Sequence, residues 1–476
     1  MRRLLKIAAS ILALSLSLSG CGNSGERISS EPVTISIWHY YNGSQQQIFD
    51  EMVSQFNETR GGELGIVVEA FSKGNVNELV QSVLDAADKK VGADEVPDIV
   101  AAYEDTAYEL KKRGMAADLS PYITKDEEAE FIDSYIDEAR MGSEDSFIIF
   151  PIAKSTECMV LNKTDWDKFE SETGTKPDFS TWESIAAIAE KYYNWTDLKT
   201  PEPDDGKAFF GRDAMANYML IGAKQLGVEL FQVENEEVTY NLDKDVLRRL
   251  WDNYYVPYIK GYYASIGRFR SDDAKTGDII ALVGSTSGAS YFPTEVKKND
   301  GSSYPIEAAV YPLPVFEGAK KVNVQQGAGM VVTKSTKEKE TAATEFLKWF
   351  TEEKQNILFS IDSGYLPVKK KSNDMNIINE YTVDSDMSDT MRDVLEIGVE
   401  MTNNYELYTT QAFDNGNEAR KILENSLMNK INEDMDKVRS AVSAGKSRQE
   451  AAAEFITDSN FDSWYNSLKT DLENVG

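Results

Sequence analysis

Residues 33–38, Val33-Thr34-Ile35-Ser36-Ile37-Trp38, form a short apolar run rich in β-branched side chains, which predicts a buried β-strand. Helix and strand signals alternate after this run, at residues 44–56 (helix), 64–68 (strand), 76–87 (helix), 97–100 (strand) and 103–113 (helix). Units of this length predict a parallel sheet with helices on its faces, so we expect an α/β fold. Ser44 and Gln47 have the spacing of a capping box, which predicts where the first helix begins.

Aromatic and polar side chains follow the ends of these predicted strands. In an open α/β sheet, ligands bind at the carboxyl ends of the strands. That rule points to Trp38–Tyr41, Phe71–Gly74 and Ala102–Glu104. The tyrosines there, Tyr40 among them, can stack on ring faces or donate hydroxyl groups, although an isolated Tyr can equally lie at the edge of a core.

The middle of the chain carries a second set of signals. Two apolar runs, 147–151 and 158–161, flank Ala153-Lys154-Ser155-Thr156, which we interpret as a crossing between lobes. A strand signal at 278–283 ends in Gly284-Ser285-Thr286-Ser287-Gly288. This loop offers hydroxyl and backbone N–H groups to a small polar ligand, and a plain serine-rich turn explains it equally well.

Arg420 follows Asp414-Asn415-Gly416-Asn417 near the start of an amphipathic helical pattern. A guanidinium beside free helix N–H groups suits a phosphate or a carboxylate. The same spacing also allows an ion pair with Glu424 on a solvent-exposed face. The residues alone leave both interpretations open.

The composition excludes several classes of protein. The 476 residues, 41% of them hydrophobic, are enough for two or more domains and exclude global disorder. The net charge of −30 repels phosphate backbones, so we expect no nucleic acid as a partner. His39 is the only histidine, which excludes a multi-histidine metal site. We find no convincing nucleotide loop and expect no cofactor, no metal and no catalytic residue.

The N-terminus predicts export. Basic residues in Met1–Lys6 and the apolar run 7–18 form a signal peptide over residues 1–20. The sequence Leu18-Ser19-Gly20-Cys21 resembles the bacterial lipobox, which implies that Cys21 is lipidated and that residues 21–31 are a tether. We therefore expect an extracytoplasmic protein anchored by lipid to the cell membrane. The alternative is an ordinary signal peptide with an incidental Cys. With Cys21 lipidated, Cys158 has no disulfide partner, and we interpret Cys158 as a buried strand residue.

Several segments in order together resemble the family 1 extracellular solute-binding proteins of bacterial ABC importers. They are Trp38–Gly43, Pro97–Val100, Pro151–Lys163, Thr181–Glu183, Gly284–Gly288, Gln326–Gly329 and Asp362–Val368. The resemblance implies a receptor that is not an enzyme, with a small-molecule solute and the transmembrane subunits of a permease as its partners.

The chain is most similar to the glycerol-3-phosphate-binding and sugar-binding members of that family. The resemblance implies ligand contacts at Glu104, Ser155, Ser287, Gly327, Tyr365 and Arg420, to which the strand-end rule adds Tyr40. Arg420 and Tyr365 would hold a phosphate, and Glu104 would receive ligand hydroxyls. The subgroup has an aromatic residue where this chain has Val76, so sugar specificity stays open.

We thus expect a two-lobed, type II periplasmic-binding-protein-like fold, with a mixed sheet flanked by helices in each lobe. The first lobe is predicted to hold residues 32–152 and 326–366, and the second lobe residues 153–325 and 367–476. Hinge crossings are expected near residues 152–156, 320–326 and 366–370. A surface glycoside hydrolase or lyase, or an adhesion lipoprotein without a transport role, are the alternative functions.

Overall fold

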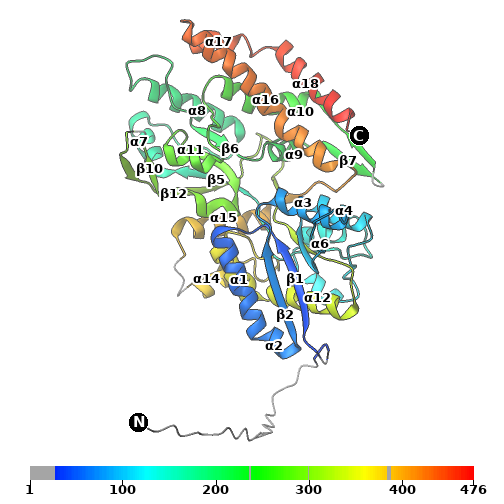
Figure 1. Ribbon diagram of the computed structural model, residues 1–476. Coiled ribbons are helices and arrows are strands. Elements are labelled where there is room, and N and C mark those ends of the chain that lie inside the picture. The colour runs from blue at the N-terminus through cyan, green and yellow to red at the C-terminus, as the bar shows by residue number, and fades with distance from the viewer. Residues whose placement is uncertain (1–26, 30, 235–236, 299, 383–386, 476) are drawn as a thin grey trace, which may run out of the picture.

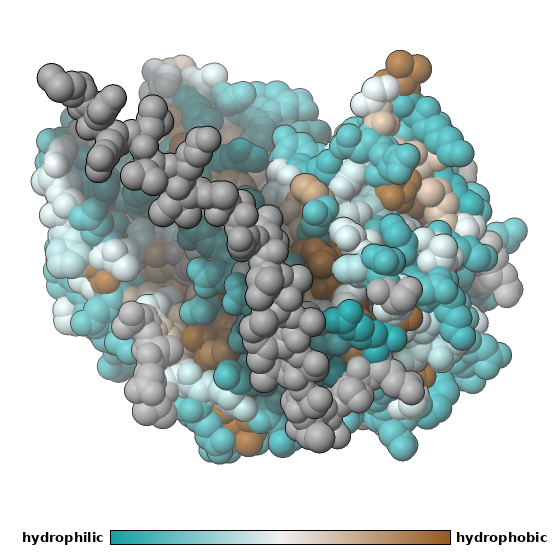
Figure 2. Space-filling model, turned by 60° about the horizontal axis from the view of Figure 1, so that its bottom comes forward, coloured by the Kyte–Doolittle hydropathy of each residue, from teal (hydrophilic) through white to brown (hydrophobic). Residues whose placement is uncertain are grey.

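The computed structural model describes residues 27–29, 31–234, 237–298, 300–382 and 387–475. They form two lobes, which lie one above the other in Figure 1. The predicted signal peptide and Cys21 lie outside the described residues, as does most of the predicted tether. The face in Figure 2 is mainly hydrophilic, with hydrophobic residues in small separate patches, as the high charge of the chain leads one to expect.

The first lobe contains a five-stranded sheet in the order β2-β1-β3-β14-β4. Its strands are β1 (Val33–His39), β2 (Ile66–Ser72), β3 (Ile99–Ala102), β4 (Ile149–Phe150) and β14 (Gly329–Val332). The strand β1 pairs in parallel with β2 and β3, whereas β14 runs antiparallel to its neighbours β3 and β4. The predicted parallel core is therefore confirmed, with one strand added from a distant part of the chain.

Helices flank this first sheet. In chain order they are α1 (Gly43–Glu58), α2 (Arg60–Leu64), α3 (Val76–Ala87), α4 (Glu104–Lys112), α5 (Lys125–Ala129), α6 (Asp133–Arg140), α12 (Lys337–Phe350) and α13 (Glu353–Ser363). The capping box predicted at Ser44 is wrong. The helix α1 begins one residue earlier with Asn42 as its N-cap, and no side-chain hydrogen bond caps it.

The second lobe contains a four-stranded mixed sheet in the order β12-β5-β9-β6. Its strands are β5 (Glu157–Asn162), β6 (Phe210–Arg212), β9 (Ala281–Ser285) and β12 (Ala308–Pro312). Two hairpins accompany it, β7 (Phe231–Glu234) with β8 (Glu237–Tyr240) and β10 (Glu295–Lys297) with β11 (Ser303–Pro305). A 3₁₀ segment, η1 (Thr286–Tyr291), continues from β9 and carries the Ser-rich loop.

The helices of the second lobe come from two distant parts of the chain. They are α7 (Lys163–Thr173), α8 (Trp182–Asp197), α9 (Met215–Gln225), α10 (Lys244–Ile259), α11 (Arg270–Thr276), α16 (Gly416–Ser443), α17 (Arg448–Ala453) and α18 (Asp458–Glu473). Figure 1 shows the long helix α16 lying across the outer side of this lobe, with α18 beside it.

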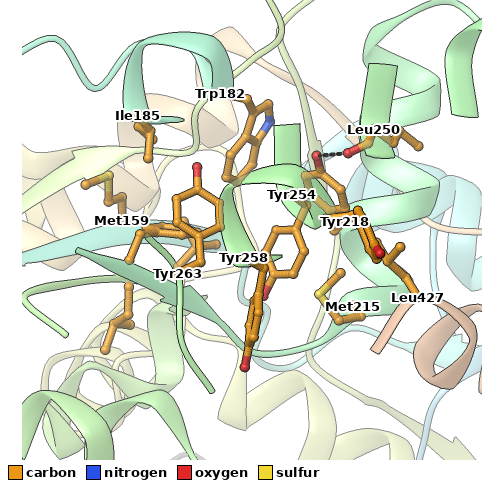
Figure 3. Close-up of a cluster of buried hydrophobic side chains, with 14 of the residues drawn as sticks. Met159, Trp182, Ile185, Met215, Tyr218, Leu250, Tyr254, Tyr258, Tyr263 and Leu427 are labelled. Atoms are coloured by element: carbon orange, nitrogen blue, oxygen red, sulfur yellow. Dashed lines mark hydrogen bonds between the residues drawn. The ribbon is translucent and has the colours of Figure 1, made fainter. Parts of the chain in front are cut away.

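The core of the second lobe is rich in aromatic side chains. Figure 3 shows Tyr218, Tyr254 and Tyr263 gathered with Trp182 among aliphatic residues and methionines. The ring of Trp182 meets that of Tyr218 edge to face, with 5.3 Å between the centroids. The hydroxyl of Tyr218 donates to the carbonyl of Leu250 at 2.9 Å, which satisfies one polar group inside this core.

Three segments of the chain lie side by side where the lobes join. Lys154 forms an antiparallel bridge with Leu366, and Ser155 forms another with Gln326. The helices α14 (Met375–Thr382) and α15 (Asp389–Asn404) and the strand pair β13 (Val322–Val324) with β15 (Glu406–Tyr408) complete this region. The fold class is confirmed, whereas the assignment of residue ranges to the two lobes stays a prediction.

Candidate functional site

Tyrosines from distant segments meet beyond the carboxyl ends of β1 and β3. Tyr40 follows β1 and Tyr103 follows β3, and their rings stack with 6.1 Å between centroids and 21° between planes. The hydroxyl of Tyr40 lies 3.3 Å from the hydroxyl of Tyr365 and accepts a hydrogen bond from the backbone N–H of Ala328 at 3.3 Å. The structure therefore brings Tyr40 and Tyr365 together beside the residue that follows Gly327.

Ser155 and Gly327 lie where the chain crosses between the lobes. Ser155 exchanges two backbone hydrogen bonds with Gln326, at 2.9 and 2.8 Å. Gly327 has a φ of +88°, and a Cβ placed there would lie 2.6 Å from the carbonyl oxygen of Ala153. Only glycine fits such a position, so the structure gives Gly327 a role in the path of the backbone.

Glu104 is a buried carboxyl group at the first turn of α4. Burial raises its pKa to about 8, and the nearby carboxylates of Glu138 and Asp105 add to the shift. One of its oxygens, Oε2, has no hydrogen-bond partner among the described residues. Since a group with this pKa is mostly protonated at neutral pH, Glu104 can donate a hydrogen bond as well as accept one.

Arg420 lies in the second turn of α16 and extends toward the first lobe. Burial raises the pKa of Asp105 on α4, and the positive charge of Arg420 opposes that shift. Nη2 of Arg420 donates a hydrogen bond to Oδ1 of Asn217 on α9. The pairing with Glu424 that the spacing suggested is not made, because Glu424 instead accepts a hydrogen bond from the N–H of Ala216 at 2.7 Å.

A cavity of about 610 Å³ lies between the lobes. Asn42 and Gln45 contribute to it from the first lobe, Gln326 comes from a crossing, and the remaining lining residues belong to the second lobe. Those are Glu157, Val160, Asp213, Ala214, Phe269, Ser271, Asp272, Lys275, Leu282, Gly284, Ser285, Ser287, Gly288, Tyr291 and Phe292. Ser287 is the one member of the predicted set that lines it, and the other predicted contacts stay predictions.

Gln45 connects the two lobes at this cavity. Its Nε2 lies 3.1 Å from the backbone oxygen of Ser287 in η1 and 3.2 Å from that of Ser363 at the end of α13. Nearby, a Cβ on Gly364 would lie 2.8 Å from the carbonyl oxygen of Thr286, which shows how closely the two backbones approach. The sequence did not predict this contact of Gln45, because the pattern of the segment indicated only a capping box.

A buried polar network supports the second-lobe wall of the cavity. Glu157 pairs with Arg212 at 2.6 Å between Oε2 and Nη2, and both side chains are 2% exposed. Oε1 of Glu157 accepts from Nδ2 of Asn217 at 2.7 Å, so Asn217 links this pair to Arg420. No local pattern in the sequence marks these contacts, because their partners come from different elements.

Three further features of the chain can be described from the structure. Cys158 lies buried in β5, as expected, and burial raises the pKa of its thiol to about 12. Within the described ranges, no three metal-ligating side chains converge on one point. None of the described helices combines the length and the apolar character that crossing a membrane requires.

Solved structures with this fold share little sequence with the chain. UgpB from Mycobacterium tuberculosis in complex with glycerophosphocholine has a TM-score of 0.66 at 17% identity, covering 94% of this chain and 99% of that chain. The cyclic α-maltosyl-1,6-maltose binding protein from Arthrobacter globiformis has a TM-score of 0.63 at 18% identity, covering 93% of this chain and 100% of that chain. The GacH receptor of Streptomyces glaucescens has a TM-score of 0.64 at 14% identity, covering 93% of this chain and 99% of that chain. At such identities the likeness establishes the two-lobed fold.

No curated protein sequence matches the chain. The family described as "Bacterial extracellular solute-binding protein" matches residues 51–387, which is well over half of the chain. The resemblance found in the sequence is thereby confirmed at the level of the family. This protein belongs to the bacterial extracellular solute-binding proteins, and it is accordingly an extracytoplasmic binding protein and not an enzyme.

Proposed function

We propose that this protein is the receptor of an ABC importer that binds a small carbohydrate between its lobes. The observation that carries the proposal is the cavity of about 610 Å³, which residues of both lobes line. A ligand there contacts both lobes at once and stabilises their closed arrangement. The closed form would then dock on the transmembrane subunits of a permease and release the solute unchanged.

The lining of the cavity favours a neutral, hydroxyl-rich ligand. Three carboxylates, those of Glu157, Asp213 and Asp272, face one ammonium group, that of Lys275. Glu157 is paired with Arg212 and Asp213 contacts Arg270, so the wall offers an anion no unpaired cluster of cations, whereas its carboxylates can accept hydrogen bonds from sugar hydroxyls. Two of the similar structures are those of carbohydrate-binding proteins, one for cyclic α-maltosyl-1,6-maltose and one in complex with acarbose, which supports the same class.

A polyol phosphate resembling glycerol 3-phosphate is the second candidate, and Arg420 favours it. The guanidinium of Arg420 faces the first lobe near Tyr103 and Asp105 and lies outside the lining of the cavity. We infer that, in this case, Arg420 and Tyr365 hold the phosphate while Glu104 binds ligand hydroxyls. The similar structure of UgpB contains glycerophosphocholine, which supports a phosphate-bearing ligand.

The other predicted contacts are part of the same proposal. Tyr40 lies beside Tyr365, Ser155 and Gly327 lie at the crossing, and Ser287 lines the cavity. A ligand that spans the junction of the lobes would meet these groups, of which Ser287 alone is not buried in this arrangement. Their hydrogen bonds would distinguish solutes, because an unsatisfied buried partner costs about 1–3 kcal/mol.

Calorimetric titration separates the two candidates. We would titrate the protein with neutral mono- and oligosaccharides, glycerol 3-phosphate and glycerophosphocholine, and repeat the titrations with Arg420→Gln. The carbohydrate proposal expects a neutral sugar to bind and the variant to bind it with unchanged affinity. Tight binding of a phosphorylated solute that Arg420→Gln abolishes would contradict it and favour the polyol phosphate. Arg420→Lys, which keeps the charge but loses the planar guanidinium, tests whether the shape of the guanidinium matters.

The alternative functions make different predictions. Membership of a binding-protein family contradicts the hydrolase or lyase alternative. An adhesion lipoprotein would show no small solute that raises its melting temperature, whereas a receptor gains stability from its ligand by mass action. Thermal-shift measurements over the same panel therefore decide between adhesion and transport.

We also propose that Cys21 carries the lipid that holds the protein at the cell membrane. The support is the sequence Leu18-Ser19-Gly20-Cys21 after an apolar run. Cells expressing the full chain should incorporate labelled palmitate into this protein, and Cys21→Ser should abolish both the label and the membrane association. Labelling that persists in Cys21→Ser would refute the anchor at this residue.

A further inference from the structure

Residues 411–415, which lead from β15 into α16, contact both lobes in turn and lie outside the lining of the cavity. Ala412 packs in the core of the first lobe, and its backbone N–H donates a hydrogen bond to the carboxyl group of Glu104. Phe413 packs in the core of the second lobe, where its ring meets that of Phe231 edge to face with 5.6 Å between the centroids. This segment is not among the predicted hinge crossings, yet it is anchored in both lobes.

The next residue, Asp414, binds the helix α4 of the first lobe. Its Oδ1 accepts hydrogen bonds from Nζ of Lys112 at 2.5 Å and from the hydroxyl of Tyr108 at 3.2 Å. The hydrogen bond from Lys112 holds the pKa of Asp414 below its ordinary value. Nδ2 of Asn415 donates to the backbone oxygen of Val475 at 3.0 Å, just after α18, so the same segment is fixed to the second lobe.

A second carboxylate makes the reverse contact, from the first lobe to the second. Asp105 lies in the first turn of α4, and a Cβ placed on Gly416, the first residue of α16, would lie 3.0 Å from Oδ1 of Asp105. Burial raises the pKa of Asp105, and the positive charge of Arg420 opposes that shift. A carboxylate beside a helix N-terminus is stabilised by the helix dipole. The helix α4 thus places a carboxylate at the start of α16 and receives one, that of Asp414, near its own end.

We propose that these contacts hold the two lobes together in the absence of solute and thereby contribute to the affinity for solute. We call them the α4–α16 clasp, which consists of Asp105, Tyr108, Lys112, Asp414, Gly416 and Arg420. The clasp is made only while the lobes are together, since α4 packs on the first sheet and α16 on the second lobe.

The effect on affinity follows from the population of the closed arrangement. A receptor that is closed for a larger fraction of the time before binding has a higher apparent affinity, because the solute supplies less of the free energy of closure. The side chains of Lys112 and Asp414 are 51% and 59% exposed, so water and salt screen this pair and its effect is moderate. This consequence rests on the proposed function, since it requires a solute that binds between the lobes.

A charge swap tests the clasp. We would compare the parent with Lys112→Glu, Asp414→Lys and the double variant that carries both changes. The radius of gyration would be measured without solute by small-angle scattering, and the affinity by calorimetric titration with maltotriose and with glycerophosphocholine. Each single variant brings like charges together, so the radius of gyration should increase and the affinity fall about twofold to fivefold. The double variant restores the attraction with reversed charges and should recover most of both properties.

The matched control is Lys111→Glu, which makes the same change of charge in the last turn of α4 but outside the clasp. It carries the same cost from the helix dipole and should behave as the parent does. A melting temperature close to that of the parent establishes that each variant is folded.

The outcomes separate the clasp from the proposed function. If the single variants keep the radius of gyration and the affinity of the parent, the clasp is refuted while the receptor stands. If the double variant is as open as the single variants, the pairing of Lys112 with Asp414 is not the cause, and the clasp is again refuted. If neither probe binds to the parent but the radius of gyration changes as expected, the clasp stands and the proposed function fails for both solute classes.

Discussion

Two buried ion pairs, one at the hinge and one in the second lobe, have similar geometry and different surroundings. In the hinge pair, Nζ of Lys154 lies 2.7 Å from both oxygens of Glu138 and 2.9 Å from the carbonyl oxygen of Gly327. In the second-lobe pair, Arg212 and Glu157 meet at 2.6 Å. All four side chains are at most 6% exposed.

The difference lies in what each pair leaves unsatisfied. Glu157 has both oxygens paired, with Arg212 and with Asn217, so the second-lobe pair forms part of a complete framework. Beside the hinge pair, Oε2 of Glu104 has no partner among the described residues, and the charges of Glu138 and Lys154 push its pKa in opposite directions. The second-lobe pair therefore stabilises a wall, whereas the members of the hinge pair also act on the pKa of Glu104, a predicted ligand-binding group whose pKa is raised mainly by burial.

Removing the cation of the hinge pair should have the largest effect. Lys154→Met leaves Glu138 buried without its partner, and we expect a loss of about 3–5 kcal/mol in the free energy of unfolding, measured in urea. Arg212→Met should cost a similar amount because Glu157 is then unpaired. Only Lys154→Met should raise the pKa of Glu104 further, since Lys154 lowers it.

The control for both variants is Lys469→Met, which removes an exposed pair with Glu473 and should cost no more than about 1 kcal/mol. A loss for Lys154→Met no larger than that of the control would contradict the role assigned to the hinge pair. A change in the titration of Glu104 caused by Arg212→Met would contradict the separation of the two networks.

The pH dependence of stability should isolate Glu104. The folded protein keeps the proton of Glu104 up to about pH 8, whereas the unfolded chain releases it near the ordinary pKa of 4.5. The folded state therefore binds more protons in this interval, so stability falls as the pH rises through it. Glu104→Gln removes this loss and should be more stable than the parent by roughly 2–4 kcal/mol above about pH 8, and comparable at about pH 5.

Unfolding in urea across this pH range measures the effect. Glu69→Gln, an exposed substitution on β2, should retain the pH dependence of the parent. The interpretation fails if Glu104→Gln and the parent lose stability with pH in parallel.

The smallest effect is expected from the contact that joins the lobes. Gln45→Ala removes the hydrogen bonds to Ser287 and Ser363, so it should weaken the closed arrangement and lower solute affinity about twofold to tenfold. Small-angle scattering should show a larger radius of gyration in the absence of ligand. Gln47→Ala, an exposed neighbour on α1, should match the parent in both measurements, and equal behaviour of the two variants would refute the contact.

The sequence predicted best what depends on short stretches of chain. The alternation from Val33 to Arg113 follows local periodicity, and it predicted the parallel core and placed Tyr40 and Glu104 at the strand ends. The resemblance predicted the two-lobed fold and the crossing at Ser155. These features depend on neighbours in the chain or on a pattern that the whole family shares.

The sequence failed where contacts join distant elements. The sequence around Gln45 has the pattern of a helix start, yet the side-chain amide of Gln45 donates a hydrogen bond to the backbone oxygen of Ser287 across the junction of the lobes. Spacing suggested Glu424 for Arg420, whereas the structure gives Asn217, which lies on another helix. The cavity formed by α11 and η1 has no local signature either, because its walls approach one another only in the folded chain.

The late entry of β14 into the first sheet determines how the chain can fold. This strand sits between β3 and β4, and every strand of the second sheet precedes it in the chain. Until residues 329–332 have been synthesised, one edge of β3 is unpaired and β4 has no partner strand. The sheet of the first lobe therefore cannot be completed before all strands of the second sheet have been synthesised. A product that stops short of β14 exposes that edge and is prone to aggregate, which makes this protein intolerant of premature termination.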